Sequence, residues 1–175
     1  ETDTIFALSS GPLVKCGVAV VRLSGPSCGD ALQELLKHSG DSSQPQSVPA
    51  PRQASVRRLY CPESGDELDR ALVLWMPGPA SFTGEDVCEL HLHGGRAVVQ
   101  GVLNALSVLD NRQEGFGIRA AERGEFTKRA FDNGKMDLTE IEGLADLLAA
   151  ETSVQRKQAL RQMDGHLRKQ FEMWR

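Results

Sequence analysis

The chain of 175 residues lacks the short motifs by which proteins usually hold nucleotide phosphates. It has no GxxxxGK sequence followed by Ser or Thr, because Gly134-Lys135 is followed by Met136 and lacks the upstream glycine. No GxGxxG sequence follows the first predicted strand, and no HExxH sequence is present. These absences exclude a nucleotide-triphosphate site built on a known loop, and we expect no catalytic residue among these 175 positions.

Cysteine is scarce and widely spaced, and long apolar runs are missing. Cys16, Cys28, Cys61 and Cys88 form no CxxC pair, which excludes a zinc ribbon and a thioredoxin-like motif. A chain of this length with an ample core does not need disulfides, so we expect reduced thiols. No apolar run could cross a bilayer, and the start shows neither a signal peptide nor an Arg-rich transit segment. We expect no membrane partner, and the start at Glu1 leaves room for a targeting segment already removed.

The chain has no strong excess of one charge. Its formal net charge is -4, with 40% hydrophobic and 25% charged residues, which predicts a globular fold and excludes a nucleic-acid-coating protein. The last part is locally basic, with Arg156, Lys157, Arg161, Arg168, Lys169 and Arg175. This stretch is either a solvated helix with i,i+4 ion pairs or a face for nucleic-acid phosphates, and we favour the first reading.

Hydrophobic alternation and turn residues predict an α+β domain over residues 1–122, with two helices on a mixed sheet. The predicted strands cover residues 4–8, 17–24, 54–61, 70–76, 86–93 and 117–121, and the predicted helices cover 27–38 and 96–108. Residues 70–76 form a near-continuous apolar run, which is typical of a buried central strand. Residues 86–93 alternate strictly, so Glu89, His91 and His93 share one face.

Residues 123–175 show helical patterns only and are expected to begin a second, helical domain. A short helix is bracketed by Gly124 and the turn pair Asn133-Gly134, and Asp137 with Glu140 can form a capping box. Two apolar stripes follow, one at Ile141, Leu144, Leu147 and Leu148 and one at Leu160, Met163, Leu167, Phe171 and Trp174. No stop signal follows the second stripe, so we expect it to pack on later sequence or on a second copy.

Three charged residues stand out as candidate ligand contacts. Glu89 lies among apolar neighbours and could accept the adjacent ring N–H and amino group of a pterin or guanine edge, or could pair with a nearby arginine. Arg22 is a lone charge in an apolar strand and needs an anion, either internal or from a ligand. Lys135 follows the Asn133-Gly134 turn, where it is either a solvated loop lysine or a partner for a ligand carboxylate.

Glu89, His91 and His93 could also be zinc ligands, since alternate residues of a strand share a face. Side chains of one strand rarely complete a tetrahedron by themselves. We therefore expect no metal site and keep zinc as a minor alternative.

Two long motifs resemble the MnmE/TrmE family of tRNA-modifying GTPases. They are PGPASFTGEDVCELHLHGG over residues 77–95, and GEFTKRAFDNGKMDLTE over 124–140 followed by GLADLLAAET over 143–152. The segments DTIFALS over 3–9 and GVAVVRLSG over 17–25 resemble the family's first strands. The likeness covers about residues 3–170, and residues 151–165 resemble the mitochondrial branch.

The resemblance implies a fold and a role. Residues 1–122 would be a tetrahydrofolate-binding and dimerisation domain similar to the folate domain of glycine-cleavage T-proteins. The ligand would be 5-formyltetrahydrofolate, with 5,10-methylenetetrahydrofolate as the one-carbon donor. Family members modify carbon 5 of the wobble uridine of certain tRNAs, as homodimers with an FAD-dependent MnmG-type partner. The eukaryotic members act in mitochondria, so this chain would serve mitochondrial tRNAs in the mitochondrial matrix. GTP, magnesium and potassium would bind in a GTPase domain outside these residues.

Carried over by position, the family's folate contacts fall on Arg22, Glu89 and Lys135. Glu89 would accept from the pterin, and Arg22 and Lys135 would face anionic or carbonyl-bearing parts of the folate. The chain departs from the family in residues 11–17, which read GPLVKCG where a glycine-rich turn is usual. Arg123 also stands where a proline or small residue is common. The first departure leaves a rival hypothesis open, namely an assembly-only dimerisation module with a vestigial folate pocket.

Overall fold

The computed structural model describes residues 3–11, 16–38, 46–110 and 117–163, which form a six-stranded sheet and five helices. The strands are β1 (Thr4–Leu8), β2 (Val18–Ser24), β3 (Ser55–Tyr60), β4 (Glu67–Met76), β5 (Val87–His93) and β6 (Ile118–Ala120). The helices are α1 (Cys28–Leu36), α2 (Arg96–Asp110), α3 (Glu125–Asp132), α4 (Leu138–Ala149) and α5 (Ser153–Met163). The sheet order is β3-β4-β5-β2-β1-β6, with β1 and β6 parallel and the other neighbours antiparallel. The predicted α+β class and mixed sheet are confirmed.

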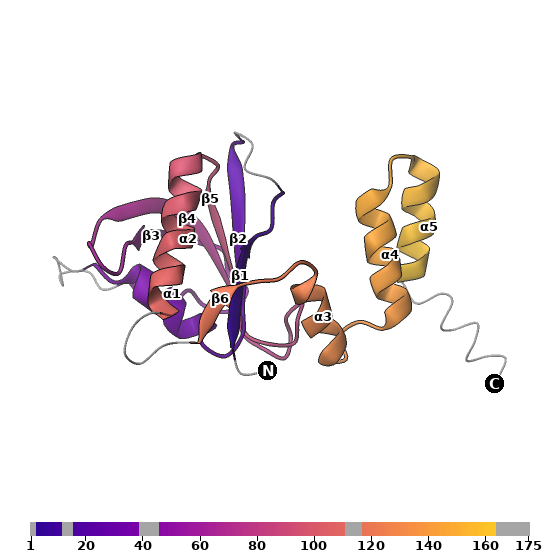
Figure 1. Cartoon of the computed structure of the whole chain (residues 1–175), viewed down its shortest axis with the longest axis horizontal. Coiled ribbons are helices and arrows are strands. Elements are labelled where there is room, and N and C mark those ends of the chain that lie inside the picture. Colours follow the sequence, from indigo (N-terminus) through magenta and orange to yellow (C-terminus); the bar gives the residue numbers. More distant parts are fainter. Residues whose placement is uncertain (1–2, 12–15, 39–45, 111–116, 164–175) are drawn as a thin grey trace. The chain divides into compact units, whose positions relative to one another are not determined.

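Helices α1 and α2 lie on one face of the sheet (Figure 1). The hydrophobic core lies between these two helices and the sheet. Alternation along β2 shows how the sequence produces this layer. Ala19, Val21 and Leu23 are buried against the helices, whereas Val18 on the opposite face is 58% exposed. The face away from α1 and α2, called here the open face, is therefore free to carry polar side chains.

Strand β4 differs from the prediction of a strand buried on both faces. It lies inside the sheet between β3 and β5, but Leu72 is 38% exposed while Val73 beside it is fully buried. The physical reason is that α1 and α2 cover only the face that carries Val73. The apolar run therefore supplies side chains to both the core and the open face.

The described cysteines are all free thiols, as expected. Cys28 and Cys88 are buried in the core. Burial raises the pKa of the Cys28 thiol well above its ordinary value, and the neighbouring Cys88 adds to the rise. Cys28 is thus an inert, protonated core residue.

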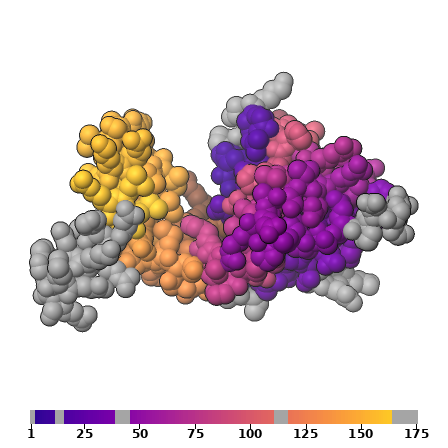
Figure 2. Space-filling model, turned by 180° about the vertical axis from the view of Figure 1, so that it is seen from behind, coloured from indigo at the N-terminus to yellow at the C-terminus, as the bar shows by residue number. Residues whose placement is uncertain are grey.

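The chain forms two compact units, residues 1–123 and 124–175. In the space-filling view, the described part of the second unit is the orange-to-yellow group of atoms (Figure 2). Among the described residues, no helix is both long enough and apolar enough to span a bilayer. Leu167, Phe171 and Trp174 of the second predicted stripe lie outside the described residues.

The predicted capping box at the start of α4 is confirmed. Asp137 Oδ1 accepts from the Glu140 amide at 2.9 Å, and Glu140 Oε2 accepts from the Asp137 amide at 2.7 Å. A similar exchange, which we did not predict, begins α5: Thr152 Oγ1 accepts from the Gln155 amide, and Gln155 Oε1 accepts from the Thr152 amide. Both helices therefore begin where side chains satisfy their first amides.

The contact between α4 and α5 depends on small residues more than on the predicted leucines. Gly143 is buried, and a Cβ there would lie 2.9 Å from the Met163 amide nitrogen. Ala159 is the buried residue of α5. Leu148 of the first predicted stripe is 82% exposed, so it does not pack within the described residues. The backbones of α4 and α5 approach closely at Gly143, which leaves no room for leucine side chains between the two helices at that point.

Replacing Asp137 with alanine is expected to destabilise the second unit by about 1 kcal/mol, because the Glu140 amide and the Thr139 hydroxyl in the first turn of α4 lose their acceptor. Thermal unfolding followed by circular dichroism at 222 nm measures this loss. Asp146→Ala, in the exposed middle of α4, is the control and should change stability by less than about 0.5 kcal/mol. Equal losses in the two variants would contradict the role of the capping box.

Candidate functional site

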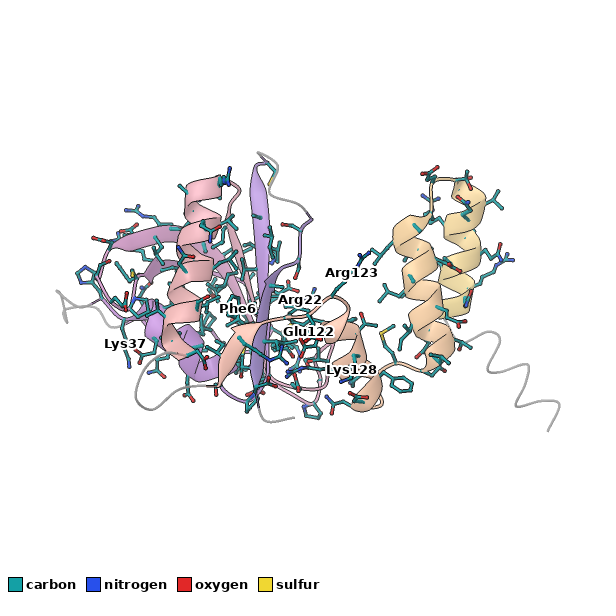
Figure 3. All side chains as sticks on the ribbon, viewed as in Figure 1. Phe6, Arg22, Lys37, Glu122, Arg123 and Lys128 are labelled. Atoms are coloured by element: carbon teal, nitrogen blue, oxygen red, sulfur yellow. The ribbon has the colours of Figure 1, made fainter. Side chains whose placement is uncertain are left out.

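Strand register brings two of the three predicted site residues together on the open face. Arg22 of β2 is paired with Glu89 of β5 in the antiparallel ladder. Arg22 Nε and Nη2 donate to Glu89 Oε1 at 3.0 and 2.7 Å. The side chains are 28% and 16% exposed, so the pair is partly shielded from water (Figure 3 labels Arg22). The internal pairing that the sequence left open is present.

The hydrogen-bonding capacity of Glu89 shows what the site can still accept. A carboxylate offers about four lone-pair positions. Arg22 occupies two of them on Oε1, and His91 Nε2 lies 3.2 Å from Oε2. One position on Oε2 remains, so a ligand that presents two adjacent N–H donors fits only if His91 or one N–H of Arg22 gives way. All three side chains lie on the same open face, so such a ligand would meet them together.

Phe82 completes the surroundings of Arg22. The Arg22 guanidinium carbon lies 5.4 Å from the centre of the Phe82 ring, within range of a cation–π contact. The Phe82 side chain is 37% exposed. It stands in the loop that joins β4 to β5, which has the sequence PGPASFTGED over residues 77–86. A flat apolar surface therefore lies beside a half-buried ion pair.

The structure does not support the minor alternative of zinc at Glu89, His91 and His93. His93 Nδ1 lies 2.7 Å from Asp69 Oδ1, and the His93 amide donates to Asp69 Oδ2 at 2.8 Å. Asp69 thus holds His93, while Glu89 is engaged by Arg22 and His91. No group of three His, Cys, Asp or Glu residues within the described ranges could hold a metal ion.

Lys135, the third predicted site residue, follows α3 in the second unit. Gly134 has a φ of 65°, the left-handed conformation that the Asn133-Gly134 pair predicts. The Lys135 amide donates to the Ala130 carbonyl at 2.7 Å, which closes the end of α3. The Lys135 side chain is exposed, and its contact with a ligand stays a prediction.

Sequence reasoning missed two residues beside the ion pair. His91 Nε2 lies 3.2 Å from Glu89 Oε2, a contact that we did not predict. Phe82 was read only as part of a motif. Its signal was a large aromatic residue inside a loop of Pro, Gly, Ser and Thr, where apolar side chains need a reason to be present.

Comparison with known proteins identifies the family. The family described as GTP-binding protein TrmE N-terminus matches residues 4–135, a stretch that holds the sheet, Arg22, Glu89 and Lys135. The chain therefore belongs to the MnmE/TrmE family of tRNA modification GTPases, of which it represents the N-terminal part.

Individual relatives narrow this assignment. The chain is 58% identical to the human mitochondrial 5-taurinomethyluridine-tRNA synthase subunit GTPB3 over 164 residues, which cover 94% of this chain and 30% of that protein. It is 56% identical to the same subunit of Danio rerio, over 98% of this chain and 31% of that protein. It is 52% identical to the tRNA modification GTPase MnmE of Methylobacterium sp. (strain 4-46), over 99% of this chain and 36% of that protein. The chain thus spans about a third of its relatives, and the mitochondrial names confirm the predicted mitochondrial location.

Proposed function

We propose that residues 1–122 are a tetrahydrofolate-binding and dimerisation domain and that residues 123–175 are the first helices of a central helical domain. The observation that carries the proposal is the placement of Arg22 and Glu89 side by side on the open face. Two residues that the family resemblance assigns to folate are 67 positions apart in sequence, yet they form one half-buried polar spot on an apolar sheet. A partly buried ion pair offers a ligand charged hydrogen-bond donors and acceptors on one surface.

The chemistry of the ion pair suits a reduced folate. Glu89 would accept from the pterin ring N–H and its amino group, which form a two-donor edge matched to a carboxylate. Arg22 would face a carbonyl oxygen or an anionic group of the same ligand. Lys135 would supply a second cation for the folate carboxylates. The ligand we propose is 5-formyltetrahydrofolate, with 5,10-methylenetetrahydrofolate as the form used in the reaction.

In the whole protein, the domain would serve modification of carbon 5 of the wobble uridine in mitochondrial tRNAs. The named relatives are a 5-taurinomethyluridine-tRNA synthase subunit and a tRNA modification GTPase, which supports this role. We propose that the chain acts in the mitochondrial matrix as a homodimer, with an FAD-dependent MnmG-type protein and tRNA as partners. GTP hydrolysis, with magnesium and potassium, would belong to a separate GTPase domain, and the present residues would perform no turnover alone.

A second candidate function is an assembly-only dimerisation module. It is favoured by the engagement of Glu89 with Arg22 and His91, which leaves the carboxylate satisfied without a ligand. Exposed apolar side chains on the sheet, Val18 at 58%, Val56 at 65% and Leu72 at 38%, offer a surface for self-association under either proposal. Dimer formation therefore does not distinguish the two candidates, whereas folate binding does.

Calorimetric titration with 5-formyltetrahydrofolate, alongside sedimentation analysis, tests the proposal. We expect a dimer that binds close to one ligand per chain. A folded dimer that releases no binding heat, and that shows no binding in equilibrium dialysis, would contradict the folate proposal and support the assembly-only module.

A further inference from the structure

The loop of residues 77–86, which joins β4 to β5, is held in place by several buried and partly buried hydrogen bonds. Ser24 and Thr83 are fully buried, and their hydroxyl oxygens lie 2.6 Å apart. The Ser24 hydroxyl also donates to Glu85 Oε2 at 2.7 Å, so Thr83 is the donor in the contact between the two hydroxyls. The Ser81 hydroxyl donates to the Glu85 carbonyl at 2.5 Å. The residues on both sides of Phe82 are thus fixed.

The outer part of the same loop is fixed as well. Arg52 Nη2 donates to the Ala80 carbonyl at 2.9 Å, and the Gly78 amide donates to Asp86 Oδ1 at 2.8 Å. Anchors of this density are not needed to connect two antiparallel strands, for which a short turn suffices. They are what is needed to hold one side chain in a defined position.

Phe82 is the side chain that the anchored loop presents to the open face. Its ring contacts the Arg22 guanidinium, and Arg22 in turn contacts Glu89. A ligand ring hydrogen-bonded to Glu89 would therefore lie on the open face close to both Arg22 and the phenyl ring. Yet Phe82 stays 37% exposed, which leaves apolar aromatic surface uncovered next to the ion pair.

We propose that Phe82 is a specificity-determining residue that stacks on the planar pyrimidine part of the pterin while Glu89 binds its donor edge. The proposal rests on the proposed folate binding and adds a contact to it. Offset stacking of two rings is worth about a tenfold change in affinity. The loop that carries Phe82 would then make the site prefer ligands with a flat conjugated ring, and not only ligands with a charged tail.

Binding of 5-formyltetrahydrofolate to Phe82→Leu, Phe82→Tyr and the unaltered protein tests the contact. We expect Phe82→Leu to weaken binding by about tenfold and Phe82→Tyr by less than about threefold, because tyrosine keeps the ring. Val154→Ala is the matched control, since it removes exposed apolar surface from α5, which is not part of the sheet. A binding constant for Phe82→Leu equal to that of the unaltered protein would overturn the inference.

A second readout separates direct stacking from a role in merely positioning Arg22. In protein protonated only at phenylalanine rings, we expect nuclear Overhauser transfer from a phenyl ring to the pterin methylene protons, lost in Phe82→Leu. Weaker binding without that transfer would make Phe82 a positioning residue and overturn the stacking proposal. Absence of folate binding by the unaltered protein would overturn the proposed function together with this inference. Folate binding that is equally strong in Phe82→Leu would overturn this inference alone.

Discussion

Replacing Glu89 with alanine is expected to abolish binding of 5-formyltetrahydrofolate while the sheet stays folded. The carboxylate would be the acceptor for two donors of the pterin edge, and hydrogen bonds to a charged group contribute about 1.5–3 kcal/mol each. Loss of both weakens binding by at least about 100-fold, as measured by calorimetry. Stability should fall by only about 1 kcal/mol, because Arg22 is 28% exposed and can regain water when its partner is removed.

Two further variants control this experiment. Glu67→Ala removes a carboxylate that is paired with Arg70 and Arg58 elsewhere on the sheet, and it should bind folate like the unaltered protein. Glu89→Gln keeps the shape and loses the charge, and it should bind at least about tenfold more weakly. Unchanged affinity for 5-formyltetrahydrofolate in a folded Glu89→Ala protein would contradict the role of Glu89 as a ligand contact.

Replacing Gly25 with alanine is expected to lower the unfolding free energy of the first unit by about 3 kcal/mol or more, from backbone strain and overpacking together. Gly25 follows β2 with a φ of 137°, a conformation that L side chains rarely adopt. An added Cβ would lie 2.6 Å from Thr4 Cα and 2.7 Å from the Asp3 carbonyl oxygen, so the backbone at the start of β1 would have to move. In thermal unfolding, the transition should shift down by more than about 10 °C.

Gly17 provides the matched control for the glycine experiment. A Cβ at Gly17 would meet no atom within 4 Å, so Gly17→Ala should change the transition by less than about 3 °C. If Gly25→Ala unfolded at the same temperature as Gly17→Ala, the close contact between the end of β2 and the start of β1 would be refuted. The affinity of the still-folded Gly25→Ala protein for folate would show whether that contact also affects the geometry of the site.

The strands and helices of the first unit could be predicted because each element carries a strong local signal. Strict alternation over residues 86–93 places Glu89 and His91 on the face opposite Leu90, and the structure bears this out. The capping pair Asp137 and Glu140 is local as well, because its members are three residues apart. Local patterns of this kind depend only on helix and strand geometry.

The partners of the site residues could not be predicted, because they depend on strand order and register. Glu89 pairs with Arg22 since β5 lies next to β2, whereas the sequence alone permits any arginine on a neighbouring strand. Leu72 is exposed because the helices cover only one face of the sheet, which an apolar run does not reveal. Phe82 meets Arg22 through a loop whose path is set by Ser24 and Thr83, 59 positions apart.

The most direct test of the account is a nuclear magnetic resonance titration of the isotope-labelled chain with 5-formyltetrahydrofolate. We predict saturable shifts of amide signals centred on Arg22 of β2 and on Glu89 and His91 of β5, with the Phe82 loop affected at the same ligand concentration. Shifts at Lys135 would add the third proposed contact. Saturable binding with no shift on β2 and β5, or no binding at all by the folded chain, would contradict the claim that the open face of this sheet is a folate site.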